Sequence, residues 1–496
     1  MKTMANGAAV PLATIPSLDL AAFREAVIGA RGRGRRVSSL FAAPRGDGLT
    51  LYLVLADDDE GVLECARAEL DGAELSSMTE AAPEVHLFER ELAEQWGVAP
   101  VGHPWLKPVR FERSRRAAPG TPAPICGVTD FFRVEGDEVH EVAVGPVHAG
   151  VIEPGHFRFQ CHGEHVFHLE ISLGYQHRGV ERSLVGGPGK RTIHTMETLA
   201  GDTSIGHATA YCQLVEALGA GRATPRGAAL RGVALELERL ANHTGDLGAL
   251  AGDVGFLPTA AYCGRLRGDF LNLTALICGS RFGRGLIRPG GTGFDVDAAQ
   301  LDELRRRLDA AARDVAGAVK LLWASPTAMA RFEDTGRLDR ELADELGLVG
   351  PAARACGLRR DVRKTHPAGI FRMVHVPLST AESGDVFARA YVRWLEIERS
   401  VEYLRAQLAE LPRGAPSRPV APPRPEHLSV ALVEGWRGEI CHTAISGADG
   451  KLAVYKVVDP SFHNWMGLAM AMRDQQISDF PLCNKSFNLS YCGHDL

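Results

Sequence analysis

Apolar residues recur at intervals of three and four through much of the chain after residue 190, which is the spacing of residues on one side of a helix. Alanine and leucine dominate these apolar positions, as the core of a helical bundle requires. A helix of about 25 residues is about 37 Å long and crosses a whole domain. The pattern therefore predicts long packed helices at Thr192–Leu218, Arg226–Gly248, Thr259–Cys278, Ala298–Ala324 and Glu382–Leu411.

Two regions show the features of strands instead, with apolar residues that alternate with polar ones or gather in short runs. The proline-rich segment Pro412–His427 cannot be helical and is expected to form an exposed loop or an arm on a partner. A further helix is expected at Ser461–Arg473. The predicted strands are Glu138–Val144, His156–Cys161, Val166–Ile171, Ala431–Val433 and Leu452–Val458.

The N-terminal part of the chain predicts a small α/β domain. Its charged residues Glu89, Glu91 and Glu94 are expected on a solvated helix face that docks on a neighbour. Glu112–Pro124 is charged and then rich in proline and alanine, which indicates a linker. The expected elements are helices at Ser17–Ala30, Gly61–Leu70 and Glu84–Trp96 and a strand at Thr50–Leu55. We therefore divide the α+β chain into a domain 1–115, a linker 116–130 and a domain 131–496.

Composition narrows the class of protein. With 45% hydrophobic and 23% charged residues, the 496-residue chain resembles ordinary globular proteins. Its formal net charge of -6 argues against nucleic-acid binding, which usually needs a basic face. The ten cysteines form no C-x-x-C pair, so they are expected to be reduced and mostly buried thiols. No apolar run is long enough to span a bilayer, so other chains would hold this one at a membrane.

Several motifs resemble a known family. They are GPVHAGVIEPGHFRF, HRGVE, GHATAYCQLVEAL, LELERLANHTGDLG and VGPAARACGLRRDVRKTHP, in this order. They resemble the large-subunit family shared by the group 4 membrane-bound NiFe-hydrogenases and the quinone-site subunit of respiratory complex I. GHPWLKPVRF, before the linker, resembles the end of the small hydrophilic subunit of complex I. The resemblance implies two fused subunits, the second built as a hydrogenase-like helical bundle with flanking strands.

The resemblance also implies where a nickel–iron centre would be held. That centre needs four thiolates from two C-x-x-C pairs. In this chain the four positions are Ala200, Thr203, Ser490 and Gly493, and none is a cysteine. Cys483 and Cys492 lie near the second pair but out of its register. The expectation is therefore a chain that holds no metal and no cofactor of its own, with these four residues and Gly201 lining the cavity.

Quinone reduction, as in complex I, is the other chemistry that the resemblance offers. It implies a histidine, His148 or His156, paired with Asp253. The tyrosine that the family places at the start of the helix falls on Gly201, so one hydrogen-bond donor is missing. Quinone therefore stays a possible ligand, because a cavity with a histidine and an aspartate can still take up protons.

Charged residues at family positions suggest proton transfer. Glu181 corresponds to the glutamate that passes protons in hydrogenases, and His177, Arg178 and His207 lie near it in the motifs. A carboxylate between cations in a low-dielectric site can act as a relay. Each site has a structural alternative. His207 could be a satisfied core histidine, Glu238 and Arg239 could pair on a helix surface, and Arg354, Asp361 and Arg363 could form a network that holds the bundle to the strands.

Together these features predict a subunit of a membrane-associated oxidoreductase complex that couples electron transfer, of the NADH–quinone or hydrogenase-related type, to ion translocation. The alternative is a non-redox subunit that bridges a soluble module to a membrane arm. The expected partners are a small iron–sulfur subunit, which carries the cluster, and antiporter-like and other integral-membrane subunits. The expected location is the cytoplasmic face of the inner (plasma) membrane, where the chain is peripheral.

Overall fold

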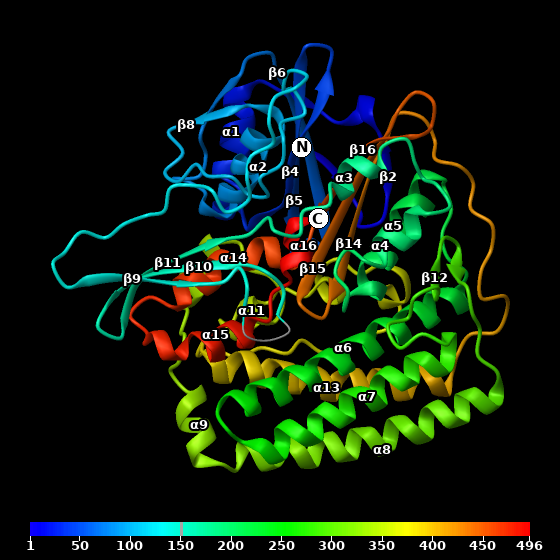
Figure 1. The fold of residues 1–496 in the computed structure, drawn as a ribbon. Helices are drawn as coiled ribbons and strands as arrows, with labels where there is room; N and C mark the ends of the chain where they lie inside the picture. Colours follow the sequence, from blue (N-terminus) through cyan, green and yellow to red (C-terminus); the bar gives the residue numbers. More distant parts are fainter. Residues whose placement is uncertain (149–151) are drawn as a thin grey trace.

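The computed structural model of the chain describes residues 1–148 and 152–496, and it combines long helices with several sheets (Figure 1). This mixture agrees with the α+β class expected from the sequence. Residues 149–151, inside the family motif Gly145–Phe159, lie outside the described residues. The long helices lie at the bottom of Figure 1, the N-terminal sheet lies at the top, and a second sheet runs between them.

The N-terminal sheet has the order β1-β6-β5-β4, with β3 beside β6. Helices α1 (Leu20–Ile28) and α2 (His86–Trp96) accompany it. The helix predicted at Gly61–Leu70 is wrong, because Val62–Leu70 forms β6 and pairs with β5 along its whole length. The strands are β1 (Lys2–Met4), β3 (Ser17–Leu18), β4 (Arg35–Arg45), β5 (Gly48–Asp57) and β6, with a parallel pair, β7 (Glu74–Ser76) and β8 (Ala99–Val101), outside the sheet.

The middle sheet joins the two ends of the chain. Its order is β16-β15-β14-β2, so β2 (Ala9–Pro11) from the N-terminus pairs with β14 (His427–Gly435). The strands predicted at Ala431–Val433 and at Leu452–Val458, which is β16, are confirmed. The strand β15 (Gly438–Ser446) between them was not predicted. One hydrophobic core contains residues of both the N-terminal and the middle sheet, so the division at residues 115 and 131 stays a prediction.

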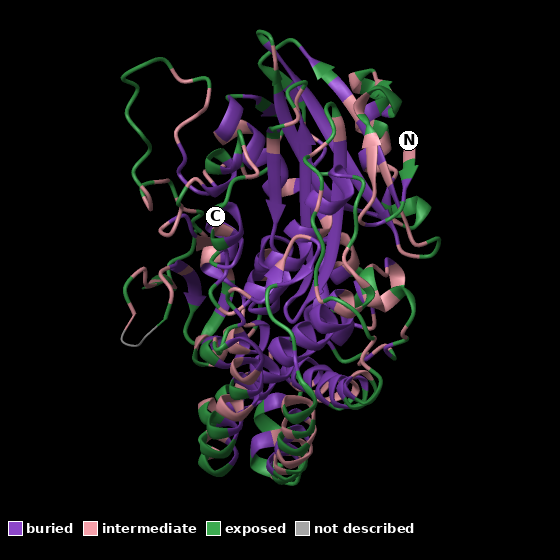
Figure 2. Cartoon of the chain, turned by 90° about the vertical axis from the view of Figure 1, so that its right-hand side faces the viewer, coloured by how far each residue is buried: buried purple, intermediate pink, exposed green. Residues whose placement is uncertain are grey.

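Four long helices form one layer: α6 (Pro225–Asp253), α7 (Leu257–Cys278), α8 (Ala298–Trp323) and α13 (Val386–Ala409). Each lies within the range predicted from periodicity or extends it by a few residues. The helix α5 (Ser204–Leu218) packs against β14 and β15 and shares one core with the bundle. Figure 2 shows that the long strands of the N-terminal and middle sheets and the inner helices are largely buried, while the ends of the outer helices are exposed.

The single helix predicted over Thr192–Leu218 is wrong. The structure has α4 (Thr192–Met196), a turn, and then α5. Gly201 is exposed in this turn, and the Glu238 carboxylate accepts hydrogen bonds from Ile205 N (2.8 Å) and Gly206 N (3.2 Å). These bonds occupy two of the free N–H groups that every helix start presents. The turn therefore places residues 197–203 at the N-terminus of α5.

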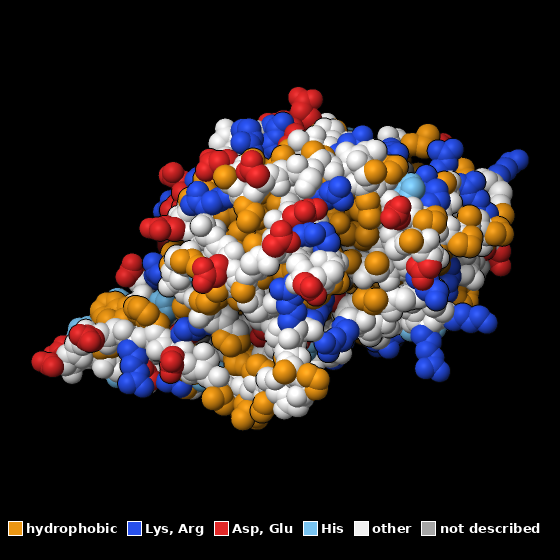
Figure 3. Space-filling model, turned by 90° about the horizontal axis from the view of Figure 1, so that it is seen from above, with side chains coloured by type: hydrophobic (Ala, Val, Ile, Leu, Met, Phe, Trp, Pro, Cys, Tyr) orange, Lys and Arg blue, Asp and Glu red, His pale blue; other side chains and the backbone are white. Residues whose placement is uncertain are grey.

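A three-stranded sheet extends from the body as an arm (Figures 1 and 3). Its strands β9 (Val139–Val144), β10 (His156–His162) and β11 (His165–Ser172) confirm the three strands predicted there. The remaining elements are α3 (Val180–Leu184), β12 (Ile287–Arg288), β13 (Gly291–Thr292), α9 (Pro326–Phe332), α10 (Arg340–Glu345), α11 (Gly350–Ala355), α12 (Val362–Thr365), α14 (Pro460–Ala471), α15 (Phe480–Phe487) and α16 (Tyr491–Asp495).

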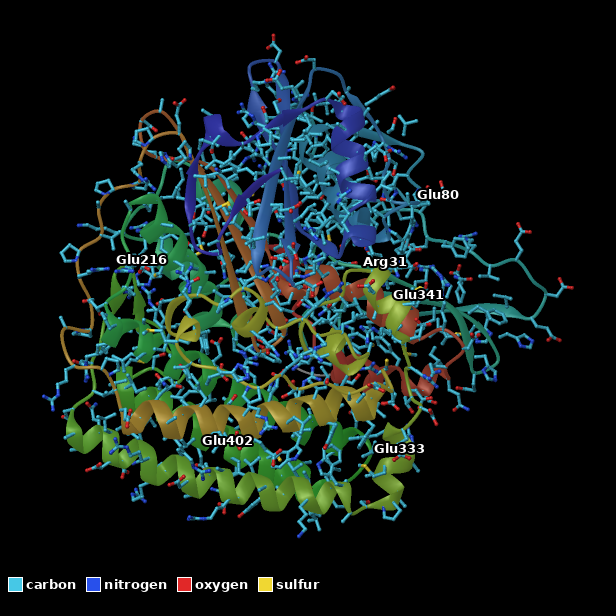
Figure 4. The ribbon with its side chains drawn as sticks, turned by 180° about the vertical axis from the view of Figure 1, so that it is seen from behind. Arg31, Glu80, Glu216, Glu333, Glu341 and Glu402 are labelled. Atoms are coloured by element: carbon cyan, nitrogen blue, oxygen red, sulfur yellow. The ribbon has the colours of Figure 1, made fainter. Side chains whose placement is uncertain are left out.

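Ion pairs join the N-terminal part to the rest of the molecule. Arg31 pairs with Asp344 and Glu345, both at 2.8 Å, and Figure 4 shows Arg31 beside the helix α10 that carries Glu341. Glu91 is buried and accepts hydrogen bonds from Lys456 at 2.6 Å. The solvated helix face predicted around Glu91 is therefore wrong, because the Glu91 side chain is buried against Lys456 of β16 and Arg110.

Across residues 1–148 and 152–496, none of the helices combines the length and the apolar character that a membrane span requires.

Candidate functional site

The turn before α5 and the last residues of the chain meet at one place. Arg178 joins them, because its guanidinium donates to Thr198 O (2.8 Å), Leu199 O (3.0 Å) and Cys492 O (3.2 Å). His177 Nδ1 donates to Asp495 O at 2.8 Å. Both residues lie in HRGVE, so this motif holds together two segments that are about 300 residues apart in the sequence.

A chain of buried polar side chains begins beside this junction. His207 Nε2 lies 3.0 Å from Asp459 Oδ2, and His207 Nδ1 lies 3.0 Å from His442 Nε2. His442 Nδ1 lies 2.8 Å from the Tyr455 hydroxyl. All four side chains are at most 3% exposed. One pattern of protons satisfies every contact: Tyr455 donates to His442, His442 donates to His207, and His207 donates to the Asp459 carboxylate.

Electrostatics supports this direction of the hydrogen bonds. Burial alone would raise the pKa of Asp459, but the hydrogen bond from His207 and the charge of Arg437 outweigh it and lower the pKa. Burial lowers the pKa of His442 well below its usual range, so this ring is neutral and can donate through one nitrogen and accept through the other. The series of hydrogen-bonded side chains therefore ends at the ionised carboxylate of Asp459.

A second acidic group lies at the start of α5. Glu238 is buried, and burial raises its pKa to about 8, although Ile205 N and Gly206 N donate to it. Its carboxyl group is therefore protonated at neutral pH. It lines a small cavity together with Asp202, Ile205, Asn242, Leu271, Thr274, Arg281 and Phe282. Asp202 stays ionised beside it, because Arg437 donates to it at 2.6 and 2.8 Å.

A pH titration tests the protonation of Glu238. The folded pKa of about 8 lies above the ordinary glutamate value of 4.5, so the folded chain binds more protons than the unfolded chain between these values. This contribution to stability is complete below pH 4.5 and is lost as pH rises towards 8. We expect Glu238→Gln to remove a slope of up to about 1.4 kcal/mol per pH unit from the unfolding free energy, measured by denaturation between these pH values. A slope equal to that of the parent chain would contradict the assignment.

Sequence comparisons show which known proteins the chain resembles. Residues 253–428 match the family described as respiratory-chain NADH dehydrogenase, 49 Kd subunit. The chain is 30% identical over 356 residues to the carbon monoxide-induced hydrogenase of Rhodospirillum rubrum, covering 70% of this chain and 97% of that protein. It is 30% identical over 371 residues to NADH-quinone oxidoreductase subunit 4 of Thermus thermophilus, covering 69% and 90%. It is 28% identical over 445 residues to formate hydrogenlyase subunit 5 of Escherichia coli, covering 86% and 78%.

The chain belongs to this family of hydrogenase and complex I subunits.

The structure places the four family ligand positions around the junction. Ala200 and Thr203 lie in the turn before α5, while Ser490 caps α16 by accepting from Gly493 N at 2.9 Å. A Cβ atom on Gly493 would lie 2.7 Å from Asp459 Oδ2, so the carboxylate fills the space that a side chain there would need. None of Ala200, Thr203, Ser490 and Gly493 carries a thiol group. In the part of the chain that the structure describes, no group of three or more His, Cys, Asp or Glu side chains could hold a metal.

Glu181, on α3, lies in a different environment from the polar chain. It is buried and pairs with Lys456 at 3.0 Å and with Arg115 at 3.5 Å, and it accepts from Val457 N at 3.0 Å. Burial opposes ionisation, but the charges of Lys456, Arg110 and Arg115 outweigh it and lower the pKa of Glu181 to about 2. In this family member Glu181 is therefore a fixed anion near neutral pH, while Glu238 carries a proton.

The residues expected for quinone chemistry are not joined by hydrogen bonds. Asp253, at the end of α6, pairs with Lys485, and the described contacts include no hydrogen bond from Asp253 to His148 or His156. His156 Nδ1 donates to Gly145 O at 3.1 Å, while His148 Nε2 and His156 Nε2 are buried without a partner within the described residues. The contacts of Asp253, His148 and His156 therefore do not test the expected quinone site, which stays a prediction.

A network of buried ion pairs connects α6, α11, α13 and β14. Arg239 and Glu238 are both buried, so the helix-surface pairing predicted for them is wrong. Arg239 donates to Gly435 O at 3.0 Å and to Glu434 O at 2.8 Å, and it pairs with Glu396 on α13 at 3.4 Å. Arg354 pairs with Glu396 and Glu434, and Arg363 pairs with Asp361 and Glu236, which is the network that the sequence offered as a structural alternative.

Three residues of the site were not predicted from the sequence: Asp459, His442 and Tyr455. His207 was a candidate, and Glu238 was expected to pair on a helix surface. Asp459 carries one local signal, because it precedes Pro460 and Ser461 as a helix cap and accepts from Ser461 N at 2.8 Å. His442 and Tyr455 each lie within a strand, and a lone polar residue there has no distinguishing pattern.

Proposed function

We propose that the chain is a subunit of a membrane-associated oxidoreductase complex, in which it couples electron transfer in a partner to proton uptake and ion translocation without a nickel–iron centre. The observation that carries this proposal is that Asp459 and its hydrogen-bonded chain occupy the space beside Gly493, where the family would place a thiolate. In this proposal the turn before α5 and the helix α16 meet as the family positions require. The side chains between them, Asp459 and its hydrogen-bonded neighbours, exchange protons.

The residues around the junction divide into two kinds of proton site. His442 and His207 each have one ring nitrogen facing each neighbour, so a proton can pass along them to Asp459. Glu238 holds a proton at neutral pH and releases it when a positive charge approaches the cavity, since nearby charges shift the pKa of a buried carboxyl group. The iron–sulfur cluster of a small partner subunit would supply one-electron chemistry, and antiporter-like membrane subunits would move the ion. A quinone would be the acceptor of the electrons.

Transport by the intact complex tests this function. We expect Glu238→Gln, and separately His207→Gln, to reduce ion translocation per electron by about tenfold or more, since a positioned acid or base typically contributes at least that factor. The complex is purified, reconstituted into vesicles, and assayed for electron transfer and for ion uptake in parallel. Glu303→Gln is the matched control, because Glu303 pairs with Arg306 and Arg307 on the exposed side of α8. Nickel bound to this chain in stoichiometric amount would falsify the proposal.

A non-redox bridging role is the second candidate, and the buried ion pairs favour it. Arg354, Glu396 and Glu434 are at most 3% exposed and tie helices to the middle sheet, as a rigid connector would require. In that case Glu238→Gln, Glu181→Gln and Asp253→Asn would all leave coupled transport unchanged while the complex still assembles. The two candidates are thus separated by the same vesicle assay.

A further inference from the structure

A cavity lies where the N-terminal part of the chain meets α14 and α16, away from the polar chain of the functional site. It has about 450 Å³ of space that protein atoms do not fill, part of it open to solvent. Its wall comes from α2, from the segment after β8, from the end of β11, and from α14 and α16 (Figure 1). The apolar part of the wall consists of Leu87, Val109, Ile171, Leu173, Met466 and Ala469.

Arg90 is the charged residue of this wall. It is 8% exposed, and within the described residues it has no carboxylate within ion-pair distance. Its guanidinium donates to Lys107 O and Pro108 O, both at 2.8 Å, and lies 5.4 Å from the centre of the Trp105 ring. The two neighbouring acids are engaged elsewhere: Glu94 accepts from Arg110 N, and Glu170 pairs with Lys107. A buried cation without an anion is costly, so Arg90 is suited to an anionic ligand.

Three other residues of the wall carry a ring nitrogen that is buried and has no hydrogen-bond partner in residues 1–148 and 152–496. They are Trp105 Nε1, Trp465 Nε1 and His86 Nδ1. Buried polar groups are normally paired, so three such atoms in residues that line one cavity point to a ligand or water there. An indole nitrogen can only donate, so a partner of Trp105 and Trp465 must accept hydrogen bonds. No aspartate or glutamate belongs to the described wall.

We propose that this cavity binds a small organic monocarboxylate. The carboxylate lies against Arg90 and the indole N–H groups, because a carboxylate supplies both the negative charge and several acceptor positions. The short hydrocarbon part lies against the apolar wall. A free inorganic anion would leave that wall without a contact, and a neutral alcohol would leave Arg90 without a counter-charge. The ligand contacts both α2 and α14, so it connects the N-terminal part to the segment that ends in the functional site.

Titration of the full-length chain with butyrate tests this site, using calorimetry and tryptophan fluorescence. We expect saturable binding of butyrate and none of 1-butanol, chloride or inorganic phosphate. Trp465→Phe keeps the ring and removes one donor, so it is expected to weaken binding by about tenfold. Arg90→Gln is expected to abolish saturable binding. Trp323→Phe is the matched control, since Trp323 Nε1 is also buried without a partner among the described residues but lies outside this wall.

Each result decides the proposal. Saturable binding of butyrate that Trp465→Phe weakens and Trp323→Phe leaves unchanged supports it. Absence of saturable butyrate binding, an equal affinity in Trp465→Phe and the parent chain, or binding of phosphate but not butyrate would overturn it. Because Arg90 also holds two backbone carbonyls, Arg90→Gln could disturb the local fold, and Trp465→Phe keeps the test decisive in that case. None of these measurements depends on electron transfer or ion transport.

Discussion

We expect Arg354→Met to lower the free energy of unfolding by about 3–5 kcal/mol, because it removes the cation from a buried cluster and leaves the anions behind. Arg354 is 0% exposed, donates to Glu434 at 2.7 Å and to Arg360 O at 2.6 Å, and also pairs with Glu396. Methionine fills a similar volume but cannot donate. Glu434 and Glu396 would then lose the cation that both contact in a low-dielectric interior, where an uncompensated charge is costly.

Urea denaturation of the purified chain, followed by circular dichroism, measures this effect. Arg306→Met provides the control, because Arg306 also pairs with a glutamate, Glu303 at 2.7 Å, but does so in solvent. An exposed pair contributes little, so the control is expected to unfold at nearly the same urea concentration as the parent chain. Equal losses in the two variants would show that the buried cluster does not stabilise the fold more than a surface pair.

Lys456→Met is expected to lower the free energy of unfolding by about 3–5 kcal/mol at neutral pH, and by less in acid. Lys456 lies between Glu91 on α2 and Glu181 on α3, at 2.6 and 3.0 Å. The folded pKa of Glu181 is about 2, below the ordinary glutamate value of 4.5, so its ion pairs stabilise the fold above pH 4.5 and are lost as pH falls towards 2. In the variant, burial without Lys456 raises this pKa, so the penalty exists only where the carboxylate is ionised.

The measurement is a series of denaturation curves from pH 7 towards pH 3, taken for the parent chain, Lys456→Met and Lys451→Met. Lys451 is exposed at the end of the β15–β16 hairpin and has no ion pair within the described residues, so it controls for the loss of one positive charge. We expect the difference in unfolding free energy between the parent chain and Lys456→Met to decrease as the pH falls. A difference in unfolding free energy that stays constant with pH would mean that lost packing, and not the unpaired carboxylates, accounts for the destabilisation.

The long helices could be predicted from the sequence because their apolar spacing is continuous and their ends carry clear signals. Thr224 and Pro225 begin α6, and Asp297 caps α8. Strands buried on both faces have no alternation to detect, and β15 is buried along its whole length. The segment Val62–Leu70 has apolar spacing that also suits a helix, and only its pairing with β5 decides that it is a strand. Local pattern cannot supply that information.

The candidate site was predictable only in part. The family motifs identified the positions Ala200, Thr203, Ser490 and Gly493, and the structure brings His177, Arg178 and the chain end together there. The roles of the charged residues depend on burial and partners, which the sequence does not contain. Glu181 and Glu238 are both glutamates next to arginines in the sequence, yet their pKa values are about 2 and about 8. The difference arises because Lys456 and Arg110 face Glu181, whereas Glu238 faces mainly backbone N–H groups.

The pairing of β2 with β14 has a consequence for biosynthesis. Val10 lies opposite Leu428 in this sheet, so β2 cannot pair until more than four hundred further residues have been synthesised. Until then, β2 presents unpaired backbone groups, and the loop that must close is very long, which slows this step. The pairing of β2 with β14 is therefore expected to form late, after the helices, whose contacts are local in the sequence.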